Sequence, residues 1–286
     1  MDLFVLNLLN GISFGAILFL LASGLTIMFG VMGILNLAHG ALYMIGAYVG
    51  WTIAIQYRLS FGLSLLAAGL AGGLVGLVIE RGFLRNLHQQ LNEQVLLTFG
   101  FIYIATNLSL WIWGPVGRAP FTAPFLSGSF RIGDLYYPLD RIAIIIVGGA
   151  LAIGLWWLQD KTRIGAILRA GMDYKEITMA LGINLPRVSI FVFFLAAFIA
   201  GAAGVIGAPL FGAHVGIALD VLLLAIIVII VGGVGSIQGA LLASMLIGVI
   251  DAFGKALFPQ FAMFTMYLLM IIILLIRPSG LLGRRV

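Results

Sequence analysis

The sequence has little charge and no cysteine. Its 15 basic and 10 acidic residues make up 9% of 286 residues, whereas soluble domains carry about 25% charged residues. With 63% apolar residues, a soluble fold could not cover its surface with polar groups, which excludes a soluble enzyme. The absence of cysteine excludes a disulfide framework, a Cys-ligated zinc site and a thiol nucleophile. The composition therefore predicts an integral membrane protein.

Nine long apolar runs predict an all-α, polytopic integral membrane helical bundle with about eight to ten transmembrane helices. A spanning helix needs about 20 apolar residues, and the runs are continuous rather than alternating as in a transmembrane β-barrel. The second and eighth runs follow glycine-rich breaks, so either could be re-entrant. No soluble domain fits, so we expect residues 1–286 to form a single transmembrane domain. The runs cover residues 5–29, 37–56, 60–80, 94–114, 141–158, 188–210, 217–235, 238–254 and 261–276.

The few basic residues are unevenly distributed along the chain. Ten of the 15 Lys and Arg residues fall in loop 80–93, loop 159–187 and the C-terminal tail. The positive-inside rule places these three segments on the cytoplasmic side. Loop 115–140, which contains four prolines and the pair Tyr136-Tyr137, then lies outside with the N-terminus.

The centre of loop 159–187 predicts a short helix outside the membrane. Asp173 and Glu176 have the spacing of a capping box, with Asp in place of Ser or Thr. Gly182 suits the C′ position just after a helix. These signals predict a helix of about two turns over residues 174–181.

The same helix has an apolar face that needs a partner. Ile177, Ala180 and Leu181 share one side of it. A helix of two turns is not stable alone in water, so it must dock on something. Two alternatives remain open: the helix ends of the protein itself, or a groove on a soluble partner.

Asn36 and His39 stand where glycines interrupt an apolar run. Asn36 could cap the helix that follows. A broken helix at membrane depth is tolerated only where it is buried in protein or lines a cavity. His39 therefore either lines a path through the membrane or forms a structural hydrogen bond with a neighbouring carbonyl. We expect no metal site, because His88 and His214 lie in separate loops.

The stretch Gly232–Gly239 is rich in glycine but lacks the Lys-Ser/Thr pair of a phosphate-binding loop. The chain is therefore not expected to bind ATP, and no cofactor is predicted. The stretch instead favours a tight cytoplasmic turn between two spans, with Ser236 capping the second.

Pairs of glycines four residues apart recur along the chain. Small residues let membrane helices approach closely. The pairs predict packing within the chain, with an interface to a second subunit as the alternative. They are Gly11/Gly15, Gly46/Gly50, Gly69/Gly73, Gly72/Gly76 and Gly235/Gly239.

Carboxylates are nearly absent from the middle of the predicted spans. Glu80, Asp220 and Asp251 all lie near span ends. Carriers coupled to protons or sodium usually have acidic groups at mid-membrane, and cation channels have rings of charge. An intramembrane hydrolase would need convergent catalytic groups, and no such motif is present. The energy source is therefore expected to belong to another subunit.

Four motifs occur in one order along nearly the whole chain. They are Asn36–Gly40 followed by Met44–Tyr48, the loop containing Glu176, Ala180 and Gly182, the stretch Gly232–Ala240, and the tail Arg277–Gly283. The loop is similar to the Glu-Ala-Ala…Gly loop of ABC importer permeases. Together the motifs resemble the branched-chain amino acid permease family of those importers.

The resemblance implies a function, partners and sites. It implies a permease subunit in the bacterial inner membrane that translocates Leu, Ile and Val. The implied partners are a second related permease, two cytoplasmic ATPase subunits, a periplasmic solute-binding protein and the lipid bilayer, but no nucleic acid. It also implies that Asp173, Glu176, Ala180 and Gly182 couple the chain to the ATPase. Asn36 and His39 are candidates for the translocation path.

The sequence departs from the family pattern at two places. Ala41 stands where family members often have an acidic residue after the His-Gly pair, and residues 217–231 lack a basic residue that some members have. Both departures concern the substrate. Urea, short amides or other amino acids therefore remain alternative substrates, and a secondary carrier or channel remains the alternative from another class.

Overall fold

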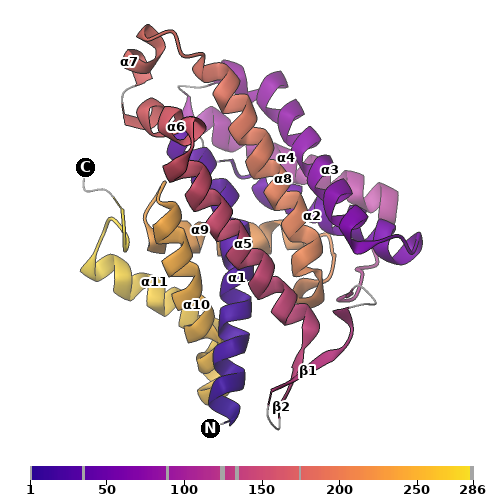
Figure 1. Cartoon of the computed structure of the whole chain (residues 1–286). Helices are drawn as coiled ribbons and strands as arrows, with labels where there is room; N and C mark the ends of the chain where they lie inside the picture. Colours follow the sequence, from indigo (N-terminus) through magenta and orange to yellow (C-terminus); the bar gives the residue numbers. More distant parts are fainter. Residues whose placement is uncertain are drawn as a thin grey trace.

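The computed structural model describes residues 2–33, 36–87, 90–122, 126–132, 135–173 and 175–283, and within these the side chains of residues 31, 32, 132, 171–173, 175, 176, 186 and 263 are not described. The described chain is almost entirely helical, with one β-hairpin (Figure 1). In order, its elements are α1 (Asp2–Met32), α2 (His39–Trp51), the π-helix η1 (Thr52–Gln56), α3 (Phe61–Gly82), η2 (Leu84–Leu87), α4 (Leu91–Trp113), β1 (Ser129–Ile132), β2 (Leu135–Pro138), α5 (Leu139–Lys161), α6 (Arg163–Asp173), α7 (Lys175–Ala180), α8 (Leu185–Phe211), α9 (Ile217–Gly232), α10 (Ile237–Leu257), η4 (Pro259–Phe264) and α11 (Thr265–Ile276).

Each of the nine predicted apolar runs corresponds to a helix. Six helices are long and apolar enough to cross a membrane: α1, α3, α4, α5, α8 and α10. The eighth predicted run is a full-length helix, because α10 has 21 residues. The second run gives the 13-residue α2, which continues directly into η1, and the shorter apolar helices α9 and α11 complete the set. The chain is a multi-pass, all-α membrane protein.

Helices α1 and α8 form the centre of the bundle, and α4 and α5 lie at its edge. In the most apolar 18-residue window of each helix, 83% of α1 and 72% of α8 are buried, against 22% of α4 and 17% of α5. The outer helices expose large apolar side chains, such as Trp111 on α4 and Ile153 on α5. In water this exposed apolar surface would promote aggregation, but in a bilayer it faces lipid.

Glycines allow the central helices to touch backbone to backbone. A Cβ atom added to Gly46 on α2 would lie 2.0 Å from the Gly201 oxygen on α8, and one on Gly11 would lie 2.6 Å from the Val249 Cα atom on α10. A Cβ atom added to any of the ten glycines of the predicted pairs would lie within 3.1 Å of another part of this chain, either backbone or side chain. The prediction that these pairs serve packing within the chain is confirmed.

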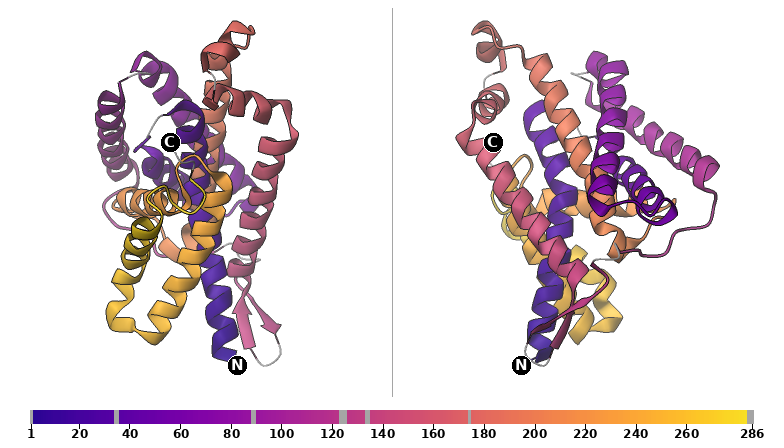
Figure 2. Two further views of the ribbon diagram at one scale, coloured as in Figure 1. Left: turned by 90° about the vertical axis from the view of Figure 1, so that its left-hand side faces the viewer. Right: turned by 45° about the vertical axis from the view of Figure 1, so that its right-hand side comes forward.

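The two long polar loops lie at opposite ends of the bundle (Figures 1 and 2). The hairpin of β1 and β2 lies near the N-terminus, and α6 and α7 project from the other end. We call these the hairpin end and the α7 end. The C-terminal tail packs on the last residues of α9, on the side of the bundle nearer the α7 end. There Leu281 and Leu282 donate main-chain hydrogen bonds to the Val231 and Gly232 oxygens. This arrangement agrees with the relative placement predicted from the basic residues.

The hairpin was not predicted, although the four residues of β1, Ser129–Ile132, alternate polar and apolar side chains. Its antiparallel register pairs Phe130 with Tyr137 and Arg131 with Tyr136. Tyr137 is buried and Tyr136 is exposed. Burial raises the pKa of the Tyr137 hydroxyl, and the positive charge of Arg141 partly opposes that shift. Arg141 also donates a hydrogen bond to Asn10, which ties the start of α5 to α1.

Candidate functional site

The short helix α7 agrees with the prediction for residues 174–181 and ends as expected. Gly182 has φ +82°, the left-handed conformation that glycine adopts without strain. Its N–H donates to the Met179 oxygen, and the Ile183 N–H donates to the Thr178 oxygen. This pair of bonds is a Schellman motif at the C-terminus of the helix. The prediction that Gly182 is the C′ residue is confirmed.

The apolar side chains of α7 are largely uncovered. Ile177 is 59% exposed, Met179 46% and Leu181 75%, and Ala180 is exposed as well. Thr178 is buried. Within the described residues, α7 packs chiefly on α6. The described part of the chain therefore leaves the predicted docking face open, on a helix that projects from the end of the bundle (Figure 1).

The other two predicted coupling residues are placed by their backbone alone. Asp173 is the last residue of α6 and Glu176 is the second residue of α7. Their side chains lie outside the described part of the structure. The capping interaction between them therefore stays a prediction.

Helix α6, which was not predicted from the sequence, connects α5 to α7 through a tight corner. Thr162 accepts a hydrogen bond from the Gly165 N–H and donates one to the Leu158 oxygen. A Cβ atom on Gly165 would lie 2.1 Å from the Gln159 oxygen, so only glycine fits there. Arg169, one helical turn further on, donates hydrogen bonds to the Gln159 oxygen and to Asp160. These contacts fix α6 against the end of α5.

His39 and Asn36 lie buried in the interior of the protein, and their assignment to the translocation path stays a prediction. His39 is fully buried, and its Nε2 atom lies 3.0 Å from the Leu21 oxygen of α1. Asn36 accepts a hydrogen bond from the Ala38 N–H at 3.1 Å, and Ala38 rather than Asn36 occupies the N-cap position of α2. The carbonyl contact that the sequence analysis considered for His39 is therefore present.

Two buried polar residues of α4, neither of them predicted from the sequence, support this break. The Thr98 hydroxyl accepts a hydrogen bond from the Leu37 N–H at 3.2 Å and donates to the Gln94 oxygen at 2.8 Å. The Gln94 side chain in turn donates to the Leu87 oxygen. Their signal in the sequence is a pair of polar residues four positions apart in an apolar run.

The glycine-rich turn between α9 and α10 has the form predicted for it. Gly233 and Gly235 have φ +98° and +78°, and the Ser236 hydroxyl accepts a hydrogen bond from the Gly239 N–H at 3.0 Å. Ser236 therefore caps α10 as predicted. A Cβ atom on Gly239 would lie 2.1 Å from the Gly232 oxygen, which explains the small residues on both sides of the turn.

Buried carboxylates are scarce in the described residues. Glu80 lies two residues before the end of α3, and Asp251 pairs with Lys255 one turn later on α10 at 2.6 Å. No group of three or more His, Cys, Asp or Glu residues that could hold a metal ion occurs in the described part of the chain.

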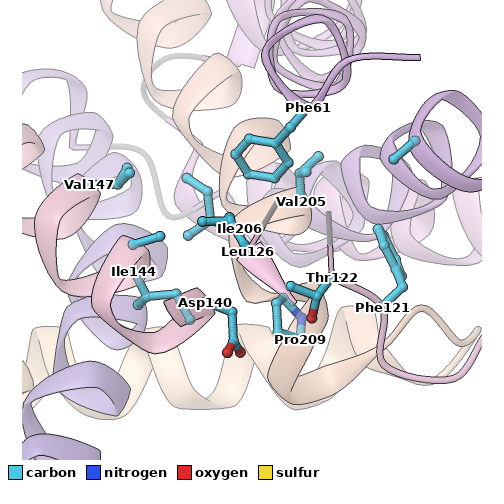
Figure 3. A pocket seen from close by; sticks show the side chains of 12 residues that line it. Phe61, Phe121, Thr122, Leu126, Asp140, Ile144, Val147, Val205, Ile206 and Pro209 are labelled. Atoms are coloured by element: carbon cyan, nitrogen blue, oxygen red, sulfur yellow. The ribbon is translucent and has the colours of Figure 1, made fainter. Parts of the chain in front are cut away.

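An apolar pocket lies toward the hairpin end, between α5, α8 and the segment before β1 (Figure 3). Its volume is about 420 Å³, counting the space open to solvent. Ile144, Ile206 and Leu126 contribute to its wall, and Asp140 is its charged residue. In Figure 3 the Asp140 carboxylate points away from Ile206 and Leu126. The pocket thus offers apolar surface without a charge directed into it.

Comparisons with known proteins agree with this architecture. A family described as "Branched-chain amino acid transport system / permease component" matches residues 7–274. The chain is 31% identical to the high-affinity branched-chain amino acid transport system permease protein BraD of Pseudomonas aeruginosa, over 97% of this chain and 95% of BraD. It is 28% identical to the corresponding protein LivH of Escherichia coli K12, over 98% of this chain and 96% of LivH.

A solved structure has the same fold. A chain of PsaBC from Streptococcus pneumoniae, in complex with a Fab, superposes with a TM-score of 0.54 at 13% identity, covering 96% of this chain and 91% of that chain. The family match spans far more than half of the sequence and runs from within α1 through all of α10. The chain belongs to the branched-chain amino acid transport system permease family.

Proposed function

We propose that the chain is the permease subunit of an ABC importer that carries Leu, Ile and Val across the bacterial inner membrane. The match to the permease family over residues 7–274 is the observation that carries this proposal. The relatives BraD and LivH are named as high-affinity branched-chain amino acid permeases, and both align over nearly the whole chain. In this proposal the α7 end is cytoplasmic and the hairpin end faces the periplasm, as the positive-inside rule predicts.

Two cytoplasmic ATPase subunits supply the energy in this proposal. The exposed side chains of Ile177, Met179 and Leu181 on α7 form a small apolar face suited to a groove on such a partner. Asp173, Glu176, Ala180 and Gly182 form the coupling segment with them. The scarcity of buried carboxylates in the described spans also supports an external energy source.

Transport then follows from a shift between two conformations. A periplasmic binding protein delivers the amino acid at the hairpin end, and a second, related permease completes the translocation pathway. ATP binding moves the α7 segment, and this movement shifts the bundle between outward-open and inward-open states. Such coupling requires that the ATPase bind the two states with different affinity.

Co-purification and substrate competition test the proposal together. The tagged chain is co-expressed with the second permease and the ATPase subunits, and Glu176→Arg is compared with the unchanged chain. The variant should lose most of the ATPase and of the uptake of labelled leucine. Full co-purification and full uptake by Glu176→Arg would show that the coupling assignment is wrong. Unlabelled isoleucine and valine should compete for uptake, and stronger competition by urea or acetamide would assign the other substrate class.

A further inference from the structure

A polar hollow and an apolar crevice adjoin each other at the α7 end. The hollow measures about 630 Å³ and the crevice about 400 Å³, each counting the space open to solvent. Four residues line both, so the two form one continuous site: Gln159, Arg169, Gly235 and Ile237.

The polar part holds two opposite charges side by side. The Arg169 Nη1 atom lies 3.1 Å from the Asp160 Oδ1 atom, and each side chain is 36% exposed. A pair this open to solvent contributes little stability, so a ligand can separate its members at low cost. A guanidinium has five N–H donors, so Arg169 can keep its contact with the Gln159 oxygen and still bind another anion.

The apolar part lies beside this pair and is aliphatic. Ile27 of α1, Leu155 and Leu158 of α5 and Leu168 of α6 line the crevice. Glycine keeps it open between α1 and the α9–α10 turn, because a Cβ atom on Gly235 would lie 3.1 Å from the Gly30 Cα atom.

We propose that this site binds a free α-amino acid with an aliphatic side chain. The amino acid's carboxylate binds Arg169, its ammonium group binds Asp160, and its side chain enters the crevice beside Leu155 and Leu168. A zwitterion replaces both halves of the existing ion pair, so neither residue is left without an opposite charge. The choice of ligand class rests on the proposed function, because the aliphatic amino acids are also the proposed cargo.

Occupancy of this site would act on the coupling segment. The contacts of Arg169 with Gln159 and Asp160 hold α6 on the end of α5, and α6 leads directly into α7. An amino acid that separates Arg169 from Asp160 changes this junction. With the α7 end in the cytoplasm, accumulated amino acid therefore lowers ATP-driven uptake by binding from inside.

Equilibrium dialysis of labelled leucine tests the binding site without any need for transport. The assembled complex in detergent, without the binding protein, should bind leucine. Isoamylamine lacks the carboxylate, 4-methylpentanoate lacks the ammonium group and glycine lacks the side chain. Each should compete at least about tenfold more weakly than leucine, because each loses one of the three interactions. Equal competition by 4-methylpentanoate, or no binding of leucine, would overturn the proposal.

Substitutions assign the binding to the two charged residues. Asp160→Asn and Arg169→Gln should each weaken leucine binding at least about tenfold. Asp140→Asn, at the opposite end, is the matched control and should bind leucine as the unchanged chain does. Gel filtration and ATPase co-purification verify that each variant is folded. Unchanged binding by both folded variants would contradict the assignment.

The effect on transport is measured in proteoliposomes. Leucine loaded inside should lower the initial rate of ATP-driven uptake by the unchanged complex, whereas 4-methylpentanoate inside should not. The ratio of rates with and without internal leucine should approach one for Asp160→Asn. If this ratio in Asp160→Asn equals the ratio in the unchanged complex, the proposed inhibition by internal amino acid is wrong. A complete lack of ATP-driven uptake would instead overturn the proposed function, while dialysis would still decide the binding site.

Discussion

The His39 Nε2 atom lies 3.0 Å from the main-chain oxygen of Leu21 and thereby joins α2 to α1 at the break between them. The ring is fully buried and packs against Gly24, where an added Cβ atom would come within 2.7 Å of its Cε1 atom. A residue so enclosed holds two helices together. This position gives His39 a structural role in the conformation seen here.

Replacement of His39 tests that role. His39→Ala removes a hydrogen bond and leaves a cavity in the core, which should cost about 2–4 kcal/mol of stability. The midpoint of thermal unfolding in detergent should fall, while uptake per folded molecule stays within a few-fold of the unchanged chain. His214→Ala, in the α8–α9 loop, is the control and should change the midpoint less. Normal stability combined with loss of uptake would point to a direct role in the path.

The contact between Gly46 and Gly201 gives a second prediction. Gly46→Ala places a Cβ atom 2.0 Å from the Gly201 oxygen, so α2 and α8 must move apart. Such overpacking should cost about 1–3 kcal/mol, seen as a lower unfolding midpoint. Gly62→Ala, where no atom lies within 4 Å, should leave the midpoint unchanged or slightly raised. Equal midpoints for the two variants would contradict this account of the packing.

The exposed face of α7 gives a third prediction. The double substitution Ile177→Ser and Leu181→Ser should reduce ATPase co-purification severalfold without lowering the unfolding midpoint, because both side chains are largely exposed in the chain itself. Leu257→Ser, which is 66% exposed at the end of α10, is the matched control and should retain the ATPase. If the double variant unfolds at a lower temperature, the face instead stabilises the permease.

The left-handed conformation of Gly182 gives a fourth prediction. Gly182→Ala places a Cβ atom in a conformation that costs about 1–2 kcal/mol, whereas Gly182→Asn should cost less, because Asn adopts it more readily. Limited proteolysis should cut near α7 faster in the Ala variant than in the Asn variant. ATP-driven uptake should fall in the same order. Identical behaviour of the two variants would argue against the Schellman turn.

The sequence was sufficient to predict the apolar helices and several of their ends. The predicted runs 217–235 and 261–276 contain the helices α9 (Ile217–Gly232) and α11 (Thr265–Ile276) but extend beyond them. Gly182 and Ser236 end or begin helices where their chemistry predicts. These features depend on local hydropathy and on backbone conformation. Both are readable from a few neighbouring residues.

Features that depend on amphipathic or short elements were missed. Helix α6 alternates Ile164 and Leu168 with Arg163 and Arg169, so a search for continuous apolar runs passes over it. Thr162 is the residue that could have predicted the start of α6, because its hydroxyl caps the helix by accepting a hydrogen bond from the Gly165 N–H. The contact between Arg169 and Asp160 could not be predicted, because it depends on the corner that brings α6 back onto α5.

The central claim is that ATP hydrolysis by a partner drives uptake through this chain. The most direct measurement is the uptake of labelled leucine into proteoliposomes that contain the complete complex, with ATP inside and the binding protein outside. The account predicts uptake that requires both ATP and the binding protein and that persists when proton and sodium gradients are collapsed. Uptake driven by an ion gradient alone, in the absence of ATP, would contradict it.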